Sequence, residues 1–377
     1  MEFWHLDGGG LPKAALACVL TIAAIWMVGP VARRIGLVDR PRGRRLHADA
    51  VPLTGGIGIF LGFAALSLTL AIESPLFFTL LFPAGLLLLT GLLDDLFELG
   101  PALKFVLQVV IVSGAVVFGD LRIESLGNLL GQGEITLGAW SAPFTVFAVV
   151  GLINAVNMID GMDGLAAFVV MVAAAWAGIV SVITGAVDDS AMLLILAGVV
   201  AGFLVLNFRR PWGRQAAVFM GDSGSSVLGF VLAWFAIELC RAPATGLYPI
   251  SAVWILALPV VDALALIVRR GVHGRNPLRG GRDHVHHVLF HNGVCHGATV
   301  GALGLMGVAA GAVGVGGWLL GVSEATLFGL LLVVFVAHVV LCEIGTETLN
   351  RQRRAHAARH PASGAHAAAE GHTVFGP

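Results

Sequence analysis

The chain has 377 residues, of which 57% are hydrophobic and only 12% are charged, and its net charge is close to zero. Ordinary soluble domains carry about 25% charged residues, whereas this chain has a mean hydropathy of +0.90. The composition therefore excludes an ordinary soluble enzyme and indicates an integral membrane protein. The four cysteines are scattered without the spacing of a disulfide framework or a metal site, so we expect them to be core thiols.

A helix needs about 20 apolar residues to cross the hydrocarbon core of a bilayer. Eleven segments are apolar over about this length, which predicts an all-α polytopic membrane protein with about eleven transmembrane helices. The first segment lacks a preceding basic region and a clear cleavage site, so we expect an anchor and not a signal peptide. The predicted spans are 11–32, 53–72, 76–93, 102–119, 140–156, 165–185, 190–206, 216–237, 249–268, 297–320 and 324–343.

Lysines and arginines predict the orientation of these spans, because short cytoplasmic loops carry most of them. With the N-terminus outside, 19 of the 22 lysines and arginines fall on the inside, and only Lys13, Arg122 and Arg241 lie outside. We therefore expect an N-out, C-in membrane domain over residues 1–345. The Ala-, His- and Gly-rich residues 346–377 are expected to form a disordered cytoplasmic tail, and alternation over 120–139 predicts a short periplasmic β-hairpin.

The notable acidic residues stand at the ends of predicted spans, all on the inside in this topology. A carboxylate at membrane depth is costly unless it is paired, hydrated or bound to a cation, so each is a candidate functional residue. Together with the histidines that follow the ninth span, they suggest a divalent metal and a phosphate-bearing substrate. The motifs are GLLDDLFEL with Asp94 and Asp95, NAVNMIDGMDG with Asp160 and Asp163, FMGDSGSS with Asp222, and DHVHH with His284, His286 and His287.

The adjacent carboxylates Asp94 and Asp95 repel each other, so one of them needs a metal, a proton or a cationic partner. Lys104, at the entry to the next span, and Gln108, one turn later, are candidate partners. The alternative is a solvated helix end or helix cap with no catalytic role.

Asn154, Asn157 and Asp160 are spaced three residues apart, which places them on one face of a helix end. Their oxygens suit a hard cation such as Mg²⁺. The alternative is an ordinary polar helix terminus. Gly161 and Gly164 are expected to end this helix and to let the backbone approach a ligand.

The sequence GDSGS at residues 221–225 resembles the surroundings of a serine protease nucleophile, but here it opens a membrane helix, which argues against that chemistry. We interpret Asp222 as a metal ligand at a helix N-terminus, where free backbone N–H groups favour an anion.

Five arginines surround the DHVHH motif in RRGVHGRNPLRGGRDHVHH. Zinc binding by the histidines is one alternative, but the loop has more of the character of a phosphate clamp. We therefore expect Arg282, His284, His286 and His287 to bind substrate. A second basic patch in the first inside loop includes Arg45 and His47, for which a purely topological role is the alternative.

These motifs, in this order, resemble the polyprenyl-phosphate N-acetylhexosamine-1-phosphate transferases over residues 39–293. DRPRGRRLH, followed by PLTGG, resembles the first cytoplasmic loop of that family. PVVDALALIVRR and the H-x-H-H pattern are most similar to the bacterial branch that uses undecaprenyl phosphate and GlcNAc-1-phosphate. The MurNAc-pentapeptide branch typically has three consecutive histidines, which this chain lacks, so the resemblance disfavours that substrate.

The resemblance implies an enzyme that converts UDP-GlcNAc and undecaprenyl phosphate to undecaprenyl-diphosphate-GlcNAc and UMP with Mg²⁺ or Mn²⁺, at the bacterial inner membrane. Its expected partners are these two substrates and the lipid bilayer, with no nucleic acid, and a homodimer is left open. A sibling transferase that uses UDP-MurNAc-pentapeptide or another UDP-N-acetylhexosamine, and an ion-coupled secondary transporter, remain as alternatives. The implied residues are Asp94, Asp95, Asp160 and Asp163 for catalysis, Asp222 and Asn154 for metal, and Lys104, Asn157, Arg45, His47, Arg282, His284, His286 and His287 for substrate.

Overall fold

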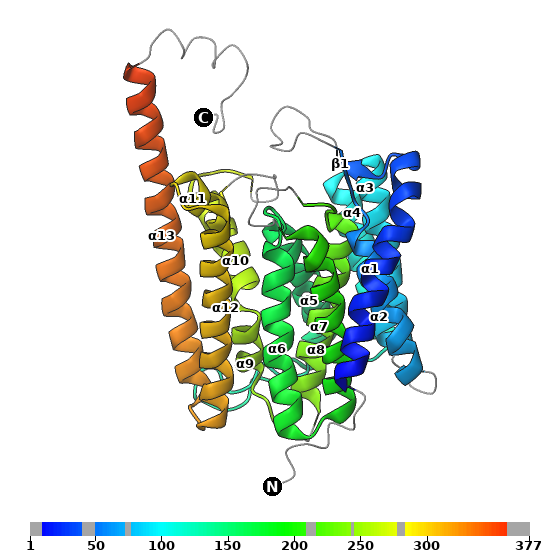
Figure 1. Ribbon diagram of the computed structural model, residues 1–377. Helices are drawn as coiled ribbons and strands as arrows, with labels where there is room; N and C mark the ends of the chain where they lie inside the picture. Colours follow the sequence, from blue (N-terminus) through cyan, green and yellow to red (C-terminus); the bar gives the residue numbers. More distant parts are fainter. Residues whose placement is uncertain are drawn as a thin grey trace.

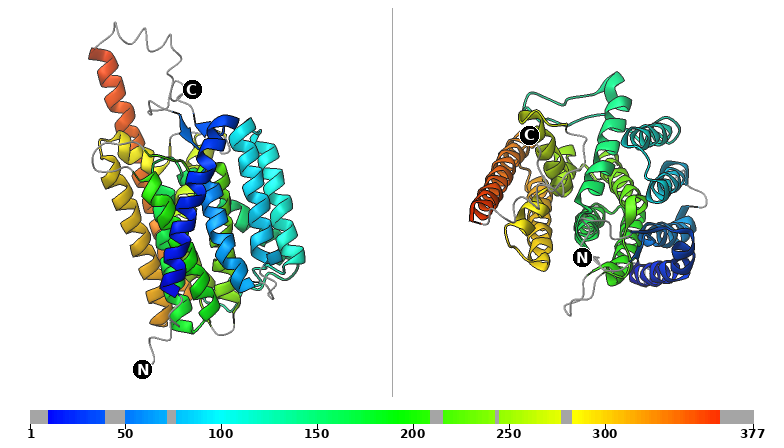
Figure 2. Two further views of the ribbon diagram at one scale, coloured as in Figure 1. Left: turned by 45° about the vertical axis from the view of Figure 1, so that its right-hand side comes forward. Right: turned by 90° about the horizontal axis from the view of Figure 1, so that it is seen from above.

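A computed structural model describes residues 10–39, 50–71, 77–208, 216–242, 245–276 and 283–359. These residues form a bundle of helices that run roughly along one axis (Figures 1 and 2). The helices are α1 (Gly10–Ile35), α2 (Gly55–Ala71), α3 (Phe82–Phe97), α4 (Pro101–Phe118), α5 (Ser141–Ile159), α6 (Leu165–Thr184), α7 (Val187–Asn207), α8 (Gly221–Arg241), α9 (Pro249–Ile255), α10 (Ala257–Val272), α11 (Val285–His291), α12 (His296–Leu319) and α13 (Glu324–Arg359). Short π and 3₁₀ turns, η1 (Phe77–Leu81) and η2 (Gly138–Trp140), precede α3 and α5.

Helix α8 forms the centre of the bundle, and it packs against α2, α3, α5 and α6. Every residue from Ser223 to Phe235 is buried, as expected for a helix that is apolar on all sides. The outer helices instead expose large apolar side chains, such as Trp26 and Met27 of α1 and Leu341 of α13. This pattern fits a bundle whose outer surface faces lipid.

Among the described residues, nine helices are long and apolar enough to cross a membrane, which confirms the expected all-α polytopic membrane protein. Helix α2 is a shorter apolar helix, and α9 and α10 together form one further candidate span. Each of the eleven predicted spans therefore coincides with a helix or a helix pair. Helix α1 begins at one end of the bundle and α13 ends at the other (Figure 1).

The predicted span 249–268 is not one straight helix, because α9 and α10 meet at an angle of 84°. Pro259 lies in the first turn of α10, and its missing N–H cannot donate to the carbonyl four residues earlier. The helix therefore breaks at Leu256, which caps both pieces.

Two other segments differ in detail from the prediction. Residues 120–139 form one antiparallel bridge, between Ser125 and Thr136, in place of a regular hairpin. Gly127 and Gly131 have positive φ angles there and interrupt an extended ladder. A short pair, β1 (Val38–Asp39) with β2 (Val51–Pro52), follows α1 and was not expected. Helix α13 continues past residue 345, where we expected the tail to begin, as far as Arg359.

Candidate active site

Three helix ends bring a lysine between two carboxylates. Asp94 lies near the end of α3, Lys104 in the first turn of α4 and Asp222 in the first turn of α8. The Lys104 Nζ atom is 2.9 Å from Asp94 Oδ2 and 2.7 Å from Asp222 Oδ1. The expected pairing of Lys104 with the Asp94 motif is confirmed. The lysine therefore forms ion pairs with two carboxylates that belong to motifs more than a hundred residues apart.

The predicted stripe on α5 joins this cluster through its amides. Asn157 Nδ2 donates to Asp222 Oδ1 and also to Ser225 Oγ, the latter at 2.9 Å. Asn154 Nδ2 donates to Gln108 Oε1 and to the Val150 carbonyl, both at 2.8 Å. Gln108 thus partners Asn154 and not the Asp94 motif. Because these bonds use the Asn154 Nδ2 atom, its Oδ1 atom is not engaged in them.

Asp95 faces the start of α8 and not the lysine. Its carboxylate accepts the backbone N–H of Asp222 at 2.9 Å and that of Ser223 at 3.3 Å. A helix N-terminus leaves such N–H groups without partners inside the helix, so a carboxylate there stabilises the helix end. Asp95 therefore fixes the position of Asp222 from a neighbouring helix.

Two glycines make this contact possible. A Cβ atom on Gly91 would lie 2.3 Å from the Ser223 Cα atom, so α3 and α8 meet backbone to backbone. Gly221 has a φ of +73° and a Cβ atom there would lie 2.5 Å from Asp95 Oδ2. Space alone requires glycine at Gly91, whereas at Gly221 both the positive φ and the space require it.

Asp160 and Asp163 lie in the turn between α5 and α6. Burial, together with the nearby carboxylates of Asp222, Asp95 and Asp163, raises the pKa of Asp160 to about 8. The turn is held by Asn207 at the end of α7, which accepts the Gly164 N–H at 2.6 Å and donates to the Val218 carbonyl at 2.8 Å. Asn207 thereby links the NAVNMIDGMDG motif to the segment before α8.

The histidine motif lies on a short helix and not on the irregular loop that we expected. His284 precedes α11, and His286 and His287 form its first turn. His286 is fully buried against Gly161, where a Cβ atom would lie 2.4 Å from His286 Nε2. Burial lowers the pKa of His286 to about 3, with contributions from His287 and His284. His286 is therefore neutral at physiological pH, and it offers a ligand a ring nitrogen or a packing surface but no positive charge.

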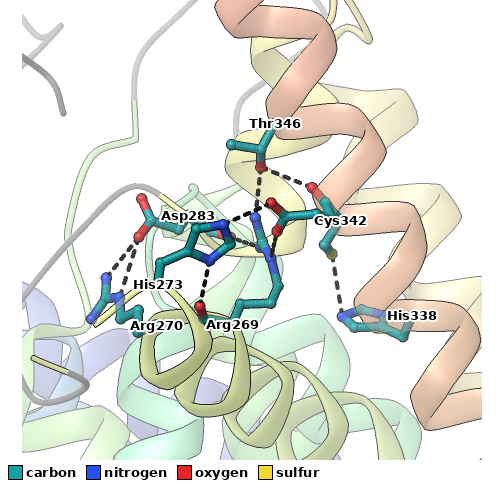
Figure 3. A network of polar contacts seen from close by, with 8 residues as sticks. Arg269, Arg270, His273, Asp283, His338, Cys342 and Thr346 are labelled. Carbon is teal, nitrogen blue, oxygen red and sulfur yellow. Dashed lines mark hydrogen bonds and ion pairs between the residues drawn. The ribbon is translucent and has the colours of Figure 1, made fainter. Parts of the chain in front are cut away.

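The start of the histidine segment is bound to α10 and α13 by two arginines (Figure 3). Arg270 pairs with Asp283 at 3.2 Å. Arg269 donates to the Asp283 carbonyl at 2.9 Å, to Thr346 Oγ1 at 2.7 Å and to Glu343 at 3.0 Å. These two buried arginines of the RRGVHGRNPLRGGRDHVHH sequence thus serve to position the loop.

A cavity of about 1760 Å³ runs from the aspartate and histidine motifs along the bundle. The end at these motifs is lined by Asp94, Lys104, Asn154, Asn157, Asp160, Arg270, His284 and His287. Charged residues also line the opposite end, namely Arg122, Glu124, Glu134, Arg241 and Glu324. Apolar residues of α4, α5 and α10, such as Phe105, Val146 and Val260, line its length. The charged compartment at the aspartate and histidine motifs therefore opens into a long apolar stretch, which lies between the two polar ends of the cavity.

Most predicted site residues are brought together, while Arg45, His47 and Arg282 lie outside the described residues. Three further residues of the site, Ser225, Asn207 and Asp262, were not predicted from the sequence. Asp262 of α10 is 3% exposed and bonded to His284 at 2.8 Å. A lone carboxylate inside an apolar segment was a signal that could have identified it.

Lys104, Asp94 and Asp222 form what we call the Lys104 cluster. Its oxygen donors are the two carboxylates, and the side-chain amides of Asn154 and Asn157 lie beside it. Such donors fit a hard divalent cation. Asp262, His338 and Cys342 form another buried group, in which three ligand atoms lie within 4.8 Å of one another.

Comparison with known proteins identifies the family. Residues 77–240 match the model of glycosyl transferase family 4. The chain is 34% identical to the undecaprenyl-phosphate alpha-N-acetylglucosaminyl 1-phosphate transferase of Haemophilus influenzae, over 82% of this chain and 87% of that protein. This chain belongs to glycosyl transferase family 4.

Other relatives carry the same name. The Pasteurella multocida protein is 36% identical over 70% of this chain and 74% of its own length. The Salmonella typhi protein is 32% identical over 73% of this chain and 75% of its own length. The family resemblance expected from the motifs is thus confirmed, and the chain is a multi-pass membrane transferase.

Proposed function

We propose that this protein transfers GlcNAc-1-phosphate from UDP-GlcNAc to undecaprenyl phosphate, giving undecaprenyl-diphosphate-GlcNAc and UMP. The observation that carries the proposal is the cavity, which joins the Lys104 cluster to a long apolar compartment. A polyprenyl phosphate needs both parts, since its headgroup is anionic and its chain is apolar. The names of the relatives agree with this pair of substrates.

The active site is assigned to the cytoplasmic face of the bacterial inner membrane, with the N-terminus outside and the C-terminus inside. Support comes from the arginines in the last turns of α1 and α10, which are Arg33, Arg34, Arg269 and Arg270. Basic residues next to spans are typical of the cytoplasmic side. With the active site on this face, a UDP-sugar from the cytoplasm reaches it without crossing the membrane.

A divalent metal, Mg²⁺ or Mn²⁺, is assigned to Asp222 and Asn154. The donors are hard oxygens, and Asp222 stands at the mouth of a helix N-terminus, beside the Lys104 ammonium. When bound, such an ion supplies positive charge to the diphosphate of the donor. Asp94 lies across Lys104 from Asp222 and can complete the ligand set or accept a residual proton.

The reaction forms a bond between an oxygen of the lipid phosphate and the β-phosphorus of UDP-GlcNAc. The bond from that phosphorus to the oxygen bridging to the α-phosphate breaks, and UMP leaves with the electron pair. A phosphate monoester is already largely ionised at neutral pH, so no strong general base is required. The chain's own contribution is to align the two phosphates and to supply cationic groups to the spreading charge.

The roles of the residues follow from their places. Lys104 and Asn157 hold Asp222 and face the phosphates, while Asp95 fixes the start of α8. Asp160 and Asp163 shape the turn beside the nucleotide and the nucleophile. We assign binding of the UDP-sugar to the histidine segment together with Arg45, His47 and Arg282. Within this segment, His286 contributes an uncharged side chain.

The test is a reconstituted reaction. Purified protein is incubated with undecaprenyl phosphate, Mg²⁺ and either UDP-GlcNAc, UDP-MurNAc-pentapeptide or another UDP-N-acetylhexosamine, and the lipid product is identified by its mass. A product with UDP-GlcNAc at the highest rate is expected. A faster reaction with another donor, or no lipid-linked product at all, would contradict the proposal.

A further inference from the structure

Asp262 of α10 is a buried carboxylate that accepts hydrogen bonds from three donors. His284 Nδ1 lies 2.8 Å from Asp262 Oδ2, and the Val285 N–H is 3.1 Å from Oδ1. His338 Nε2 of α13 lies 3.1 Å from the same Oδ1. One carboxylate therefore joins α10, the start of α11 and α13.

His284 is the member of this group that reaches the cavity. It lines the cavity together with His287 and Arg270. Among the described residues its hydrogen bond uses Nδ1, so Nε2 is the nitrogen that a ligand can meet. A partner on one ring nitrogen determines which tautomer and which orientation a histidine presents at the other. Asp262 is placed to make that choice for His284.

The backbone around His284 is held by other side chains of α10 as well. Arg270 pairs with the Asp283 carboxylate at 3.2 Å, and Arg269 donates to the Asp283 carbonyl at 2.9 Å (Figure 3). The Val285 N–H is held by Asp262 itself. Three consecutive residues are thus fixed by side chains of α10, and the ring of His284 has little freedom to turn.

The same cluster has the composition of a metal site, with Asp262, His338 and Cys342 close together. Each of its ligand atoms already has a partner, however. His338 Nε2 contacts both Asp262 Oδ1 and, at 3.6 Å, Cys342 Sγ. The carboxylate also engages two donors of the histidine segment. A network of hydrogen bonds thus accounts for these contacts. Zinc bound at this cluster in the purified protein is the competing result in the tests below.

We infer that Asp262 is a positioning residue, which holds His284 by Nδ1 so that Nε2 faces the UDP-sugar, and which His338 fixes in turn from α13. The inference rests on the proposed function for the identity of the ligand. It predicts that Asp262 acts on substrate use through His284 and not through the stability of the whole bundle. Helix α13 is thereby coupled to the donor site, although it does not reach the aspartate cluster.

The first experiment is a double-mutant cycle. Asp262→Asn, His284→Gln and the double variant are assayed for the KM and kcat of UDP-GlcNAc. Loss of a buried hydrogen bond to a charged group predicts a KM at least about tenfold higher in Asp262→Asn, with a smaller change in kcat. The double variant is expected to match His284→Gln alone, because residues that act through one another are not additive. Effects that simply multiply would overturn the inference.

The second experiment does not depend on turnover. Hydrogen exchange of the peptide 283–291 is compared in the wild type, in Asp262→Asn and in Cys342→Ser, whose thiol contacts His338 but no donor of the histidine segment. Faster exchange is expected in Asp262→Asn alone. If the wild type shows no turnover with UDP-GlcNAc, the proposed function fails, while this comparison still tests the position of His284.

Two results would overturn the inference. One is equal exchange in Asp262→Asn and the wild type. The other, from metal analysis of the purified proteins, is stoichiometric zinc in the wild type that is lost in Cys342→Ser. Should Asp262→Asn fail to fold, His338→Leu removes one donor and keeps the carboxylate. That variant is expected to raise both the KM and the exchange of 283–291 by a smaller factor, and unchanged values would then overturn the inference.

Discussion

Lys104 pairs with Asp222, which we assign to the metal, and with Asp94 beside it, so replacing Lys104 should make the stability of the protein depend on a bound ion. In Lys104→Met, Asp94 and Asp222 face each other without their shared cation. Breaking a buried ion pair by removing one partner costs about 3 to 5 kcal/mol. The Asp222 side chain is 32% exposed, so water offsets part of this loss. We expect a fall of about 2 to 3 kcal/mol in the free energy of unfolding.

A divalent cation can replace the missing positive charge, so adding one should increase the thermal stability of the variant. Saturating Mg²⁺ should raise the Tm of Lys104→Met in detergent more than it raises that of the wild type, because ion binding to the folded state stabilises it. Turnover should nevertheless fall by about a hundredfold, since the lysine also faces the reacting phosphates.

The assay is thermal unfolding in detergent, with and without Mg²⁺, beside the rate of UMP release. Lys13→Met serves as the matched control, because Lys13 lies in the first turns of α1, at the opposite end of the bundle. The control should behave as the wild type in both measurements. If Mg²⁺ stabilises Lys104→Met no more than the wild type, the cluster around Lys104 is not the metal site.

Three further predictions concern Asp222, the bound metal and His286. Asp222→Asn should lower turnover by at least about a hundredfold while the protein still folds; a near-normal rate would remove Asp222 from the metal site. EDTA should abolish turnover and Mg²⁺ or Mn²⁺ should restore it, so full activity after exhaustive chelation would contradict the metal assignment. Burial lowers the pKa of His286 to about 3, so stability is lost as the pH falls below the ordinary value of about 6.5. The Tm of His286→Gln should therefore fall less than that of the wild type between about pH 7 and about pH 5, and an equal fall would refute this account.

The sequence predicted those parts of the site that depend on local spacing. Lys104 follows Asp94 across one short turn, so their pairing could be expected from the chain alone. The stripe of Asn154 and Asn157 followed from helical periodicity. The eleven apolar segments could also be recognised locally, because each membrane-spanning helix must satisfy the hydrogen bonds of its own backbone.

The remaining contacts depend on how distant helices pack and rotate. Asp95 and Asp94 are neighbours in the sequence, yet only the packing of α3 on α8 decides that Asp95 meets the N–H groups of α8. The sequence predicted that the histidines bind substrate in a phosphate-binding loop, but burial keeps the side chain of His286 uncharged. Asp262 reaches residues 22 and 76 positions away, which no local pattern reveals.

The backbone contact at Gly91 also bears on which ions the proposed metal site accepts. Because α3 and α8 touch there without intervening side chains, main-chain packing limits how far the two helices can shift relative to each other. Mg²⁺ binds oxygen at about 2.0 to 2.1 Å and Ca²⁺ at about 2.3 to 2.6 Å. If Asp94 of α3 joins Asp222 of α8 in the proposed ligand set, a larger ion needs a wider gap between these helices. We therefore expect the helix packing, as well as the ligands, to favour the smaller ion.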